Sequence, residues 1–252
     1  NYTIRLSAGN VINFTVIVND TSGNINQSEY SGVIGQIVNV LPLNCTKLNK
    51  ANTQYDLTQD ASSRGTCMYV LANNVTLDCH GFEINYSQSV IGYGINDSGY
   101  NFSIIRSCDI VQADITTDTS DSYGIYIFSN SRNNNVTNNS ITTFGGLIDD
   151  NFGVYLTSTV FNNNVYNNNI TTSGGGGYGV RLDTTAYNNN IYSNVIRINN
   201  GGLSDANGIF LFTTSYNNLV YDNNITTSGL GDGVGVNNAY NNSVYSNIIT
   251  TS

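Results

Sequence analysis

The chain has 252 residues, of which 10% are charged, and its formal net charge is −9 at pH 7. A disordered chain would carry more charge and fewer Val, Ile and Tyr residues, so we expect a folded protein. The eight Lys and Arg residues are scattered along the sequence, which argues against nucleic-acid binding. No apolar run approaches the roughly 20 residues of a membrane span, and we expect none. The chain shows no signal peptide and begins with Asn rather than Met, so we expect a processed product or a fragment.

Residues 1–43 differ from the rest and predict short β-strands. Apolar residues alternate from Tyr2 through Ile4 to Leu6 and again from Ile12 to Val18, and another apolar stretch runs from Val33 to Leu41. Three strands rarely stand alone in water, so they need a partner sheet. They would cap the first unit of the domain that follows, complete an immunoglobulin-like domain, or add to a neighbouring subunit by strand donation.

Residues 44–252 form a second predicted domain, in which one phrase recurs: an Asn-rich run, an apolar residue, more Asn and then Ile-Thr-Thr. The steps between successive copies are 29, 26, 29 and 24 residues, counted from Val136. A period in this range indicates stacked units that cannot bury their apolar faces alone. The apolar anchors are Val136, Val165, Ile191, Val220 and Val244, each followed five residues later by Ile.

Each unit predicts short strands. A Gly is followed by alternating apolar residues, as in 124–127, and the Asn-flanked anchor pair follows. Such segments are β-branched and bounded by Asn, Ser and Gly, and no window of the repeat has helical spacing. The five-residue spacing extends backwards to Ile105 and Ile110 and to Leu77 and Phe82. We therefore predict a parallel β-helix with about seven coils from residue 67 to residue 252.

The segment GTCMYVLANNVTLDCHGF, residues 65–82, resembles the first coils of right-handed parallel β-helix repeat proteins of the pectate-lyase-like superfamily. The later Tyr-Gly-Ile-Tyr-Ile and Asn-Asn-Val-Thr phrases are similar to the same repeat. The resemblance covers residues 65–252 and implies an all-β, right-handed, single-stranded parallel β-helix behind the N-terminal segment. It does not select a function, because that superfamily holds lyases, hydrolases, tailspikes, adhesins and proteins with no chemistry.

An asparagine ladder is predicted at the third residue after each anchor. His80 and Cys108 hold this position in the earlier coils, and Asn holds it in the later ones. Stacked amides would bond from coil to coil and cap turn groups that are otherwise buried unpaired. The predicted ladder consists of Asn139, Asn168, Asn194, Asn223 and Asn247.

Aromatic residues recur at two further positions. One row lies four residues before the anchors, and a second lies one residue after them, where strand alternation points it outward. The outward row has three interpretations: in-register stacking between coils, a subunit interface, or a sugar-stacking surface. The rows are Phe161, Tyr187, Tyr216 and Tyr240, and Tyr166, Tyr192, Tyr221 and Tyr245.

The four cysteines, Cys45, Cys67, Cys79 and Cys108, indicate an oxidising compartment. Cys79 and Cys108 fall on neighbouring coils within disulfide reach, which leaves Cys45 to pair with Cys67. Four cysteines allow three pairings, so the alternatives stay open. None of the cysteines forms a close sequence pair and His80 is the only histidine, so we expect no metal site and no cofactor.

The chain holds 14 Asn-x-Ser/Thr triplets. Composition alone explains most of them, although an exported glycoprotein carrying N-linked glycans also fits. The candidate acceptors are Asn13, Asn19, Asn74, Asn101, Asn135, Asn169 and Asn224.

Catalytic groups are sparse. A lyase of the superfamily would need acidic Ca²⁺ ligands and a base, and a hydrolase would need clustered carboxylates. Asp149–Asp150 is the one acidic pair, and His80 shares a face with Asp78 only if the turn permits. The remaining candidates do not recur at one position of the repeat: Asp183, Asp205, Asp232, Arg106, Arg132, Arg181 and Arg197. We therefore expect no enzymatic activity.

The last repeat, 232–252, has no capping helix or charged tail, so we expect an apolar end that needs covering. Our leading hypothesis is a non-enzymatic extracellular protein that assembles head to tail into a cell-surface filament or array. The alternatives are a carbohydrate-binding adhesin or lyase-like β-helix, and a slice of a longer surface protein. The interface candidates are Tyr2, Ile4, Leu6, Val244 and Ile249.

Overall fold

The computed structural model describes residues 15–19, 25–29, 44–113, 121–144, 151–199 and 206–252. Within these ranges the regular secondary structure is entirely β-strand, which confirms the all-β prediction. β1 (Thr15–Asn19) pairs antiparallel with β2 (Ile25–Glu29). The other N-terminal predictions, including those on Tyr2, Ile4, Leu6 and Asn13, lie outside the described residues, and the domain boundary at residue 43 stays a prediction.

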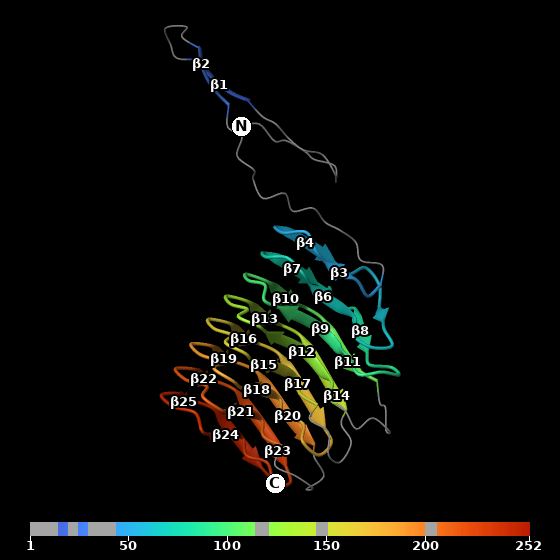
Figure 1. Ribbon diagram of the computed structural model, residues 1–252, viewed down its shortest axis with the longest axis vertical. Coiled ribbons are helices and arrows are strands. Elements are labelled where there is room, and N and C mark those ends of the chain that lie inside the picture. The colour runs from blue at the N-terminus through green and yellow to red at the C-terminus, as the bar shows by residue number, and fades with distance from the viewer. Residues whose placement is uncertain (1–14, 20–24, 30–43, 114–120, 145–150, 200–205) are drawn as a thin grey trace.

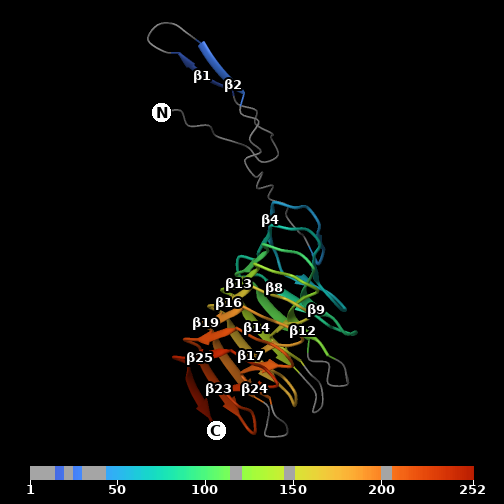
Figure 2. The same cartoon turned by 60° about the vertical axis from the view of Figure 1, so that its left-hand side comes forward.

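The described residues between 47 and 251 form a parallel β-solenoid of three eight-stranded sheets, whose rungs stack one on the next (Figures 1 and 2). Each rung contributes one strand to an opening sheet, then one to a middle sheet and one to a closing sheet. The opening sheet consists of β3 (Lys47–Leu48), β6 (Met68–Val70), β9 (Tyr93–Ser98), β12 (Tyr123–Phe128), β15 (Val154–Leu156), β18 (Val180–Leu182), β21 (Ile209–Phe212) and β24 (Val234–Asn237).

The middle sheet consists of β4 (Thr53–Asp56), β7 (Val75–Asp78), β10 (Ile104–Arg106), β13 (Asn135–Thr137), β16 (Asn164–Tyr166), β19 (Asn190–Tyr192), β22 (Leu219–Tyr221) and β25 (Ser243–Tyr245). The closing sheet consists of β5 (Ala61–Ser62), β8 (Glu83–Tyr86), β11 (Asp109–Gln112), β14 (Ser140–Phe144), β17 (Asn169–Ser173), β20 (Val195–Asn199), β23 (Asn224–Ser228) and β26 (Ile248–Thr251).

The core is made of aliphatic columns that run through the stack. Val136 pairs in register with Val165, and the column continues through Ile191 and Val220 to Val244. Its four interior members are fully buried, as strand alternation with β-branched residues requires. The anchors predicted from the repeat are therefore the core residues of the middle sheet.

Glycine at or just before the start of the opening strand is imposed by the stack. A Cβ on Gly124 would lie 2.5 Å from Cγ2 of Ile141 and 2.6 Å from the carbonyl oxygen of Gly153 on the next rung. Both distances are shorter than a carbon contact allows, and one of the obstacles is backbone. The Gly that precedes each apolar run in the sequence is thus the residue that lets neighbouring rungs approach.

Two details of the repeat differ from the prediction. The sheets have eight strands each, one more than the seven coils predicted from residue 67 onward, because residues 47–62 form an additional rung ahead of that point. Ile84, and not Phe82, pairs with Ile110. Leu77 and Ile84 are seven residues apart, against five for Ile105 and Ile110, so the turn after β7 is two residues longer.

Candidate functional site

The predicted asparagine ladder is present at the turn between the middle and closing sheets. Nδ2 of Asn139 donates to Oδ1 of Asn168 at 3.0 Å, and the same bond recurs from rung to rung up to Asn247. The accepting oxygen also accepts a backbone N–H. For example, the backbone N–H of Asn168 donates to Oδ1 of Asn194 at 3.0 Å. Nδ2 of Asn168 donates as well to the carbonyl of Val136 at 2.9 Å. Each buried amide therefore satisfies backbone groups on the rungs beside it.

A second ladder, which the sequence analysis missed, stands at the turn before the middle sheet. Nδ2 of Asn163 donates to Oδ1 of Asn189 at 3.1 Å, and the series continues to Asn242. These residues precede the apolar anchors by two positions, so a recurring Asn at this constant position of the repeat could have revealed the second ladder. The members are Asn134, Asn163, Asn189, Asn218 and Asn242.

In the N-terminal rungs the Cys79–Cys108 disulfide takes the place of the first ladder, and a second disulfide links the segments that lead into β3 and β6. Cys79 is bonded to Cys108 and Cys45 to Cys67, with Cα–Cα distances of 4.6 and 4.5 Å. This is the pairing that the sequence favoured. The backbone N–H of Cys108 donates to Oδ1 of Asn139 at 3.0 Å, so the ladder continues directly from the disulfide.

The two predicted aromatic rows stack in register. Ring centroids of Tyr166 and Tyr192 are 4.9 Å apart with planes within 1°, and Tyr192, Tyr221 and Tyr245 continue the stack at 5.0 and 5.2 Å. The row from Phe161 to Tyr240 has the same spacing. Because neighbouring rings cover each other's faces, solvent meets ring edges along the row. The geometry supports in-register stacking and leaves little ring face for a sugar.

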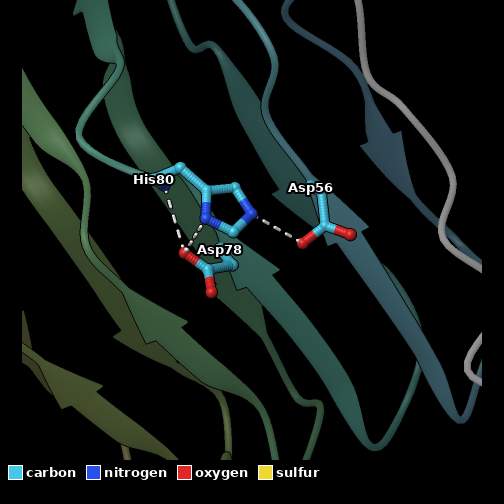
Figure 3. A group of neighbouring side chains, drawn as sticks. All are labelled: Asp56, Asp78 and His80. Atoms are coloured by element: carbon cyan, nitrogen blue, oxygen red, sulfur yellow. Dashed lines mark hydrogen bonds and ion pairs between the residues drawn. The ribbon is translucent and has the colours of Figure 1, made fainter.

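A charged cluster joins the first three rungs, and Figure 3 shows its members on the first two, Asp56, Asp78 and His80. Asp56 and Asp78 are register partners on β4 and β7 and are largely buried. Nε2 of His80 lies 3.0 Å from Oδ1 of Asp56, Nδ1 lies 3.5 Å from Oδ1 of Asp78, and Nε of Arg106 donates to Oδ2 of Asp78 at 2.8 Å. The two neighbouring carboxylates are thus held by the imidazole and the guanidinium.

His80 reaches both carboxylates because its backbone is left-handed, with φ of 50° in the long turn after β7. The sequence analysis considered Asp78 as a partner of His80 but missed Asp56, which is 24 residues away in sequence and next to Asp78 only through the stacking of rungs.

The same three side chains offer a cation two carboxylates and an imidazole, with ligand atoms within 4.8 Å of one another. However, the imidazole directs its two nitrogens to different carboxylates, as Figure 3 shows. A single ion with bonds of about 2.1 Å cannot contact Nε2 and also reach an oxygen held on the Nδ1 side. The arrangement fits an ion-pair clamp between rungs better than a metal site.

The outer face of the opening sheet carries a second feature that the sequence analysis missed. Tyr126, Tyr155, Arg181 and Phe210 occupy one outward column in register. Further rings lie beside it, and centroid distances range from 4.4 to 5.4 Å. We call this surface the aromatic face; it consists of Tyr93, Tyr123, Tyr126, Phe128, Phe152, Tyr155, Tyr178, Arg181, Phe210 and Phe212.

Arg181 lies at the centre of the aromatic face. Its guanidinium carbon is 5.1 Å from the ring centroids of both Phe152 and Phe212, and Nη2 donates to Oδ2 of Asp183 at 2.9 Å. The hydroxyl of Tyr155 donates to the same oxygen at 3.2 Å. Burial raises the pKa of Tyr126 to about 12 and also raises the pKa of Tyr155. Arg181 on β18 is therefore paired with Asp183, which directly follows that strand. Neither residue recurs at a constant position of the repeat.

The other predicted site residues are dispersed. Asp149, Asp150 and Asp205 lie outside the described residues. Arg197 on β20 donates to the side chain of Asn169, and Arg132 lies over the ring of Phe161. Among the glycosylation candidates in the solenoid, Asn74, Asn169 and Asn224 are exposed, and Asn101 and Asn135 are half-buried. Asn19 ends β1.

The interface candidates of the last repeat are exposed on the rung formed by β24, β25 and β26. Val244 and Ile249 are 44% and 45% exposed, and Val236 is 52% exposed. Their register partners on the preceding rung, Val220, Ile225 and Leu211, are fully buried.

Comparison with known proteins yielded no family model and no curated protein that matches the chain. Across the described residues, none forms a helix with the length and apolarity that a membrane crossing requires.

Proposed function

We propose that the protein is a non-enzymatic structural protein of the cell exterior, a rigid β-solenoid subunit of a surface filament or array. The observation that carries the proposal is the pair of asparagine ladders, in which buried side-chain amides are used to bind rung to rung. Two disulfides fit an oxidising location outside the cytoplasm.

The charged groups that we described have partners within the fold. His80 and Arg106 are engaged with Asp78, and Arg181 is engaged with Asp183. A catalytic constellation would instead direct an acid, a base or a nucleophile toward a substrate. These pairings support a role in cohesion, with no cofactor required.

Self-association belongs to the same proposal. A further rung placed against β24–β26 would bury Val236, Val244 and Ile249 in the way that Leu211, Val220 and Ile225 are buried one rung earlier. Parallel strand edges and apolar columns of one solenoid fit those of another, and a contact of this kind propagates into a filament.

The test is to follow assembly of the 252-residue protein by light scattering and electron microscopy. We expect concentration-dependent oligomers or filaments, which Val244→Asp with Ile249→Asp should abolish. Leu219→Asp, at a residue that is 36% exposed on β22, a strand paired on both sides, is the matched control and should leave assembly unchanged. A wild-type protein that stays monomeric at high concentration would contradict self-association.

Carbohydrate binding is a second candidate, favoured by the aromatic face. Half-buried rings beside an Arg–Asp pair offer apolar contact together with hydrogen-bonding groups, which is the combination that sugar-binding surfaces use. A polysaccharide pull-down should then be lost in Tyr126→Ala but retained in Tyr221→Ala, which alters the stacked row on the middle sheet. Equal behaviour of the two variants would remove this candidate.

A further inference from the structure

Asp97 is a carboxylic acid in an aliphatic column. It lies on β9 and pairs in register with Val70 on one side and Ile127 on the other. The column continues through Leu156 and Leu182, and all of these side chains are buried. Asp97 itself is fully buried, so a polar and ionisable group replaces the hydrocarbon that the neighbouring rungs place here.

The carboxyl group is incompletely satisfied. Oδ1 accepts the backbone N–H of Tyr100 at 3.3 Å and the hydroxyl of Ser131 at 3.4 Å, both long bonds. The hydroxyl of Ser103 interacts with the carboxyl group and lowers its pKa, but Oδ2 and this hydroxyl make no hydrogen bond of normal length among the described residues. Asp78 and Asp183, in contrast, each face a guanidinium.

The neighbouring elements offer Asp97 no compensating charge. The inward residues of β6, β9 and β12 beside it are apolar, and the titratable groups of these strands, Tyr69, Tyr93, Tyr123 and Tyr126, belong to the outer side of the sheet. Tyr100 contributes a backbone N–H. A carboxylate charge here would be desolvated with no cation in contact, and this burial outweighs the hydrogen bonds from Ser103, Tyr100 and Ser131, which favour the charged form.

We propose that Asp97 is a proton-dependent latch: as a neutral acid it closes the junction between the disulfide-linked rungs and the ladder-linked rungs, and ionisation loosens that junction. The location supports this, because Ser103 begins the second ladder by donating its backbone N–H to Oδ1 of Asn134 at 2.7 Å. Burial raises the pKa of Asp97 from 3.8 to about 7. The inference does not depend on the proposed function.

The sign of the pH dependence follows from the raised pKa. Between about pH 4 and pH 7 the folded protein keeps the proton of Asp97 while the unfolded chain loses it, so stability falls as pH rises through this range. Below pH 4 and above pH 7 the contribution of Asp97 to the free energy of unfolding does not change with pH. Relative to a variant that lacks the acid, the unfolding equilibrium constant of the wild type should rise by at least tenfold and by up to about a thousandfold.

The experiment is denaturant unfolding followed by circular dichroism from pH 4.5 to pH 8.5, comparing wild type with Asp97→Asn. Asp222→Asn, at an exposed acid on the same chain, is the matched control and should follow the wild type. We also expect proteolysis between β9 and β10 to speed up at pH 8.5 in the wild type and to remain constant in Asp97→Asn once the protease's own pH dependence is divided out.

The carboxyl carbon of Asp97, observed by NMR in the wild-type protein, supplies a readout that needs no variant. A titration midpoint near neutrality supports the latch even if Asp97→Asn fails to fold. A midpoint below pH 5, or unfolding curves of wild type and Asp97→Asn that remain parallel across the pH range, would overturn it.

Discussion

In the rungs from β3 to β11, two disulfides and the charged cluster around His80 link neighbouring rungs, whereas from β13 to β26 asparagine amides link the turns before and after the middle sheet. The two regions share the same three sheets and the same inward columns. What differs is the turn length, because the turn after β7 has two residues more than the later ones. An amide ladder needs identical turns on successive rungs, and a covalent bond does not.

The comparison teaches that regularity is itself a source of stability in this fold. Where every turn has the same length, a short uncharged side chain can satisfy backbone groups on two rungs at once. Where the turn length varies between rungs, disulfides and ion pairs link the rungs instead. The following predictions separate the two regimes, from the largest expected effect to the smallest.

Removing one amide from the ladder should lower the free energy of unfolding more than any other change considered. Asn194→Ala deletes an acceptor of two N–H groups of Asn168 and a donor to Asn223, so buried groups on both neighbouring rungs lose their partners. At about 1–3 kcal/mol for each unsatisfied group, we expect a loss of roughly 3–5 kcal/mol in urea unfolding. Asn224→Ala, at an exposed residue of β23 without a left-handed backbone, is the control. Equal losses in the two variants would contradict the ladder's role.

Breaking the covalent link should cost somewhat less. Cys79 and Cys108 close a loop with a sequence separation of 29, for which a stabilisation of about 3.5 kcal/mol is expected. We predict that the free energy of unfolding of the double variant Cys79→Ser/Cys108→Ser, measured in urea, is lower than that of the wild type by this amount. Proteolysis mapped by mass spectrometry should show that the first rungs, and not β16–β26, become accessible first; the reverse order would disprove the division into two regimes.

The charged cluster should contribute about 1–2 kcal/mol, because Arg106 is partly exposed and solvent screens its attraction to Asp78. Arg106→Leu leaves the largely buried Asp78 with the imidazole and the backbone N–H of His80. Arg197→Leu removes an exposed guanidinium from a ladder-linked rung and provides the comparison. We expect added salt to shrink the difference between the two variants, and a difference independent of salt would argue against an electrostatic origin.

The stacked tyrosines should have the smallest effect. Tyr192→Ala interrupts the stack between Tyr166 and Tyr221, and aromatic pairs are worth about 0.5–1.5 kcal/mol each, less where they are exposed. Thermal unfolding should shift by only a few degrees. A loss as large as that of Asn194→Ala would mean that the rings, and not the amides, dominate the cohesion of these rungs.

Periodic features of the sequence were sufficient to predict the fold, because each position of the repeat has one environment. The columns from Val136 to Val244 and from Asn139 to Asn247 followed directly from constant spacing. Features that occur once could not be predicted in this way. The partnership of Asp56 with His80 and the isolation of Asp97 depend on which rungs come into register, and Phe82 was misassigned because one turn is longer.

The most direct test of the central claim is hydrogen exchange of asparagine side-chain amides in ¹⁵N-labelled protein. The account predicts that the Nδ2 protons of Asn139, Asn168, Asn194 and Asn223 exchange far more slowly than those of exposed Asn138 and Asn167, by about a hundredfold or more. Ladder amides that exchange as fast as the exposed ones would show that the rungs are not held by amide stacking, and would contradict the account.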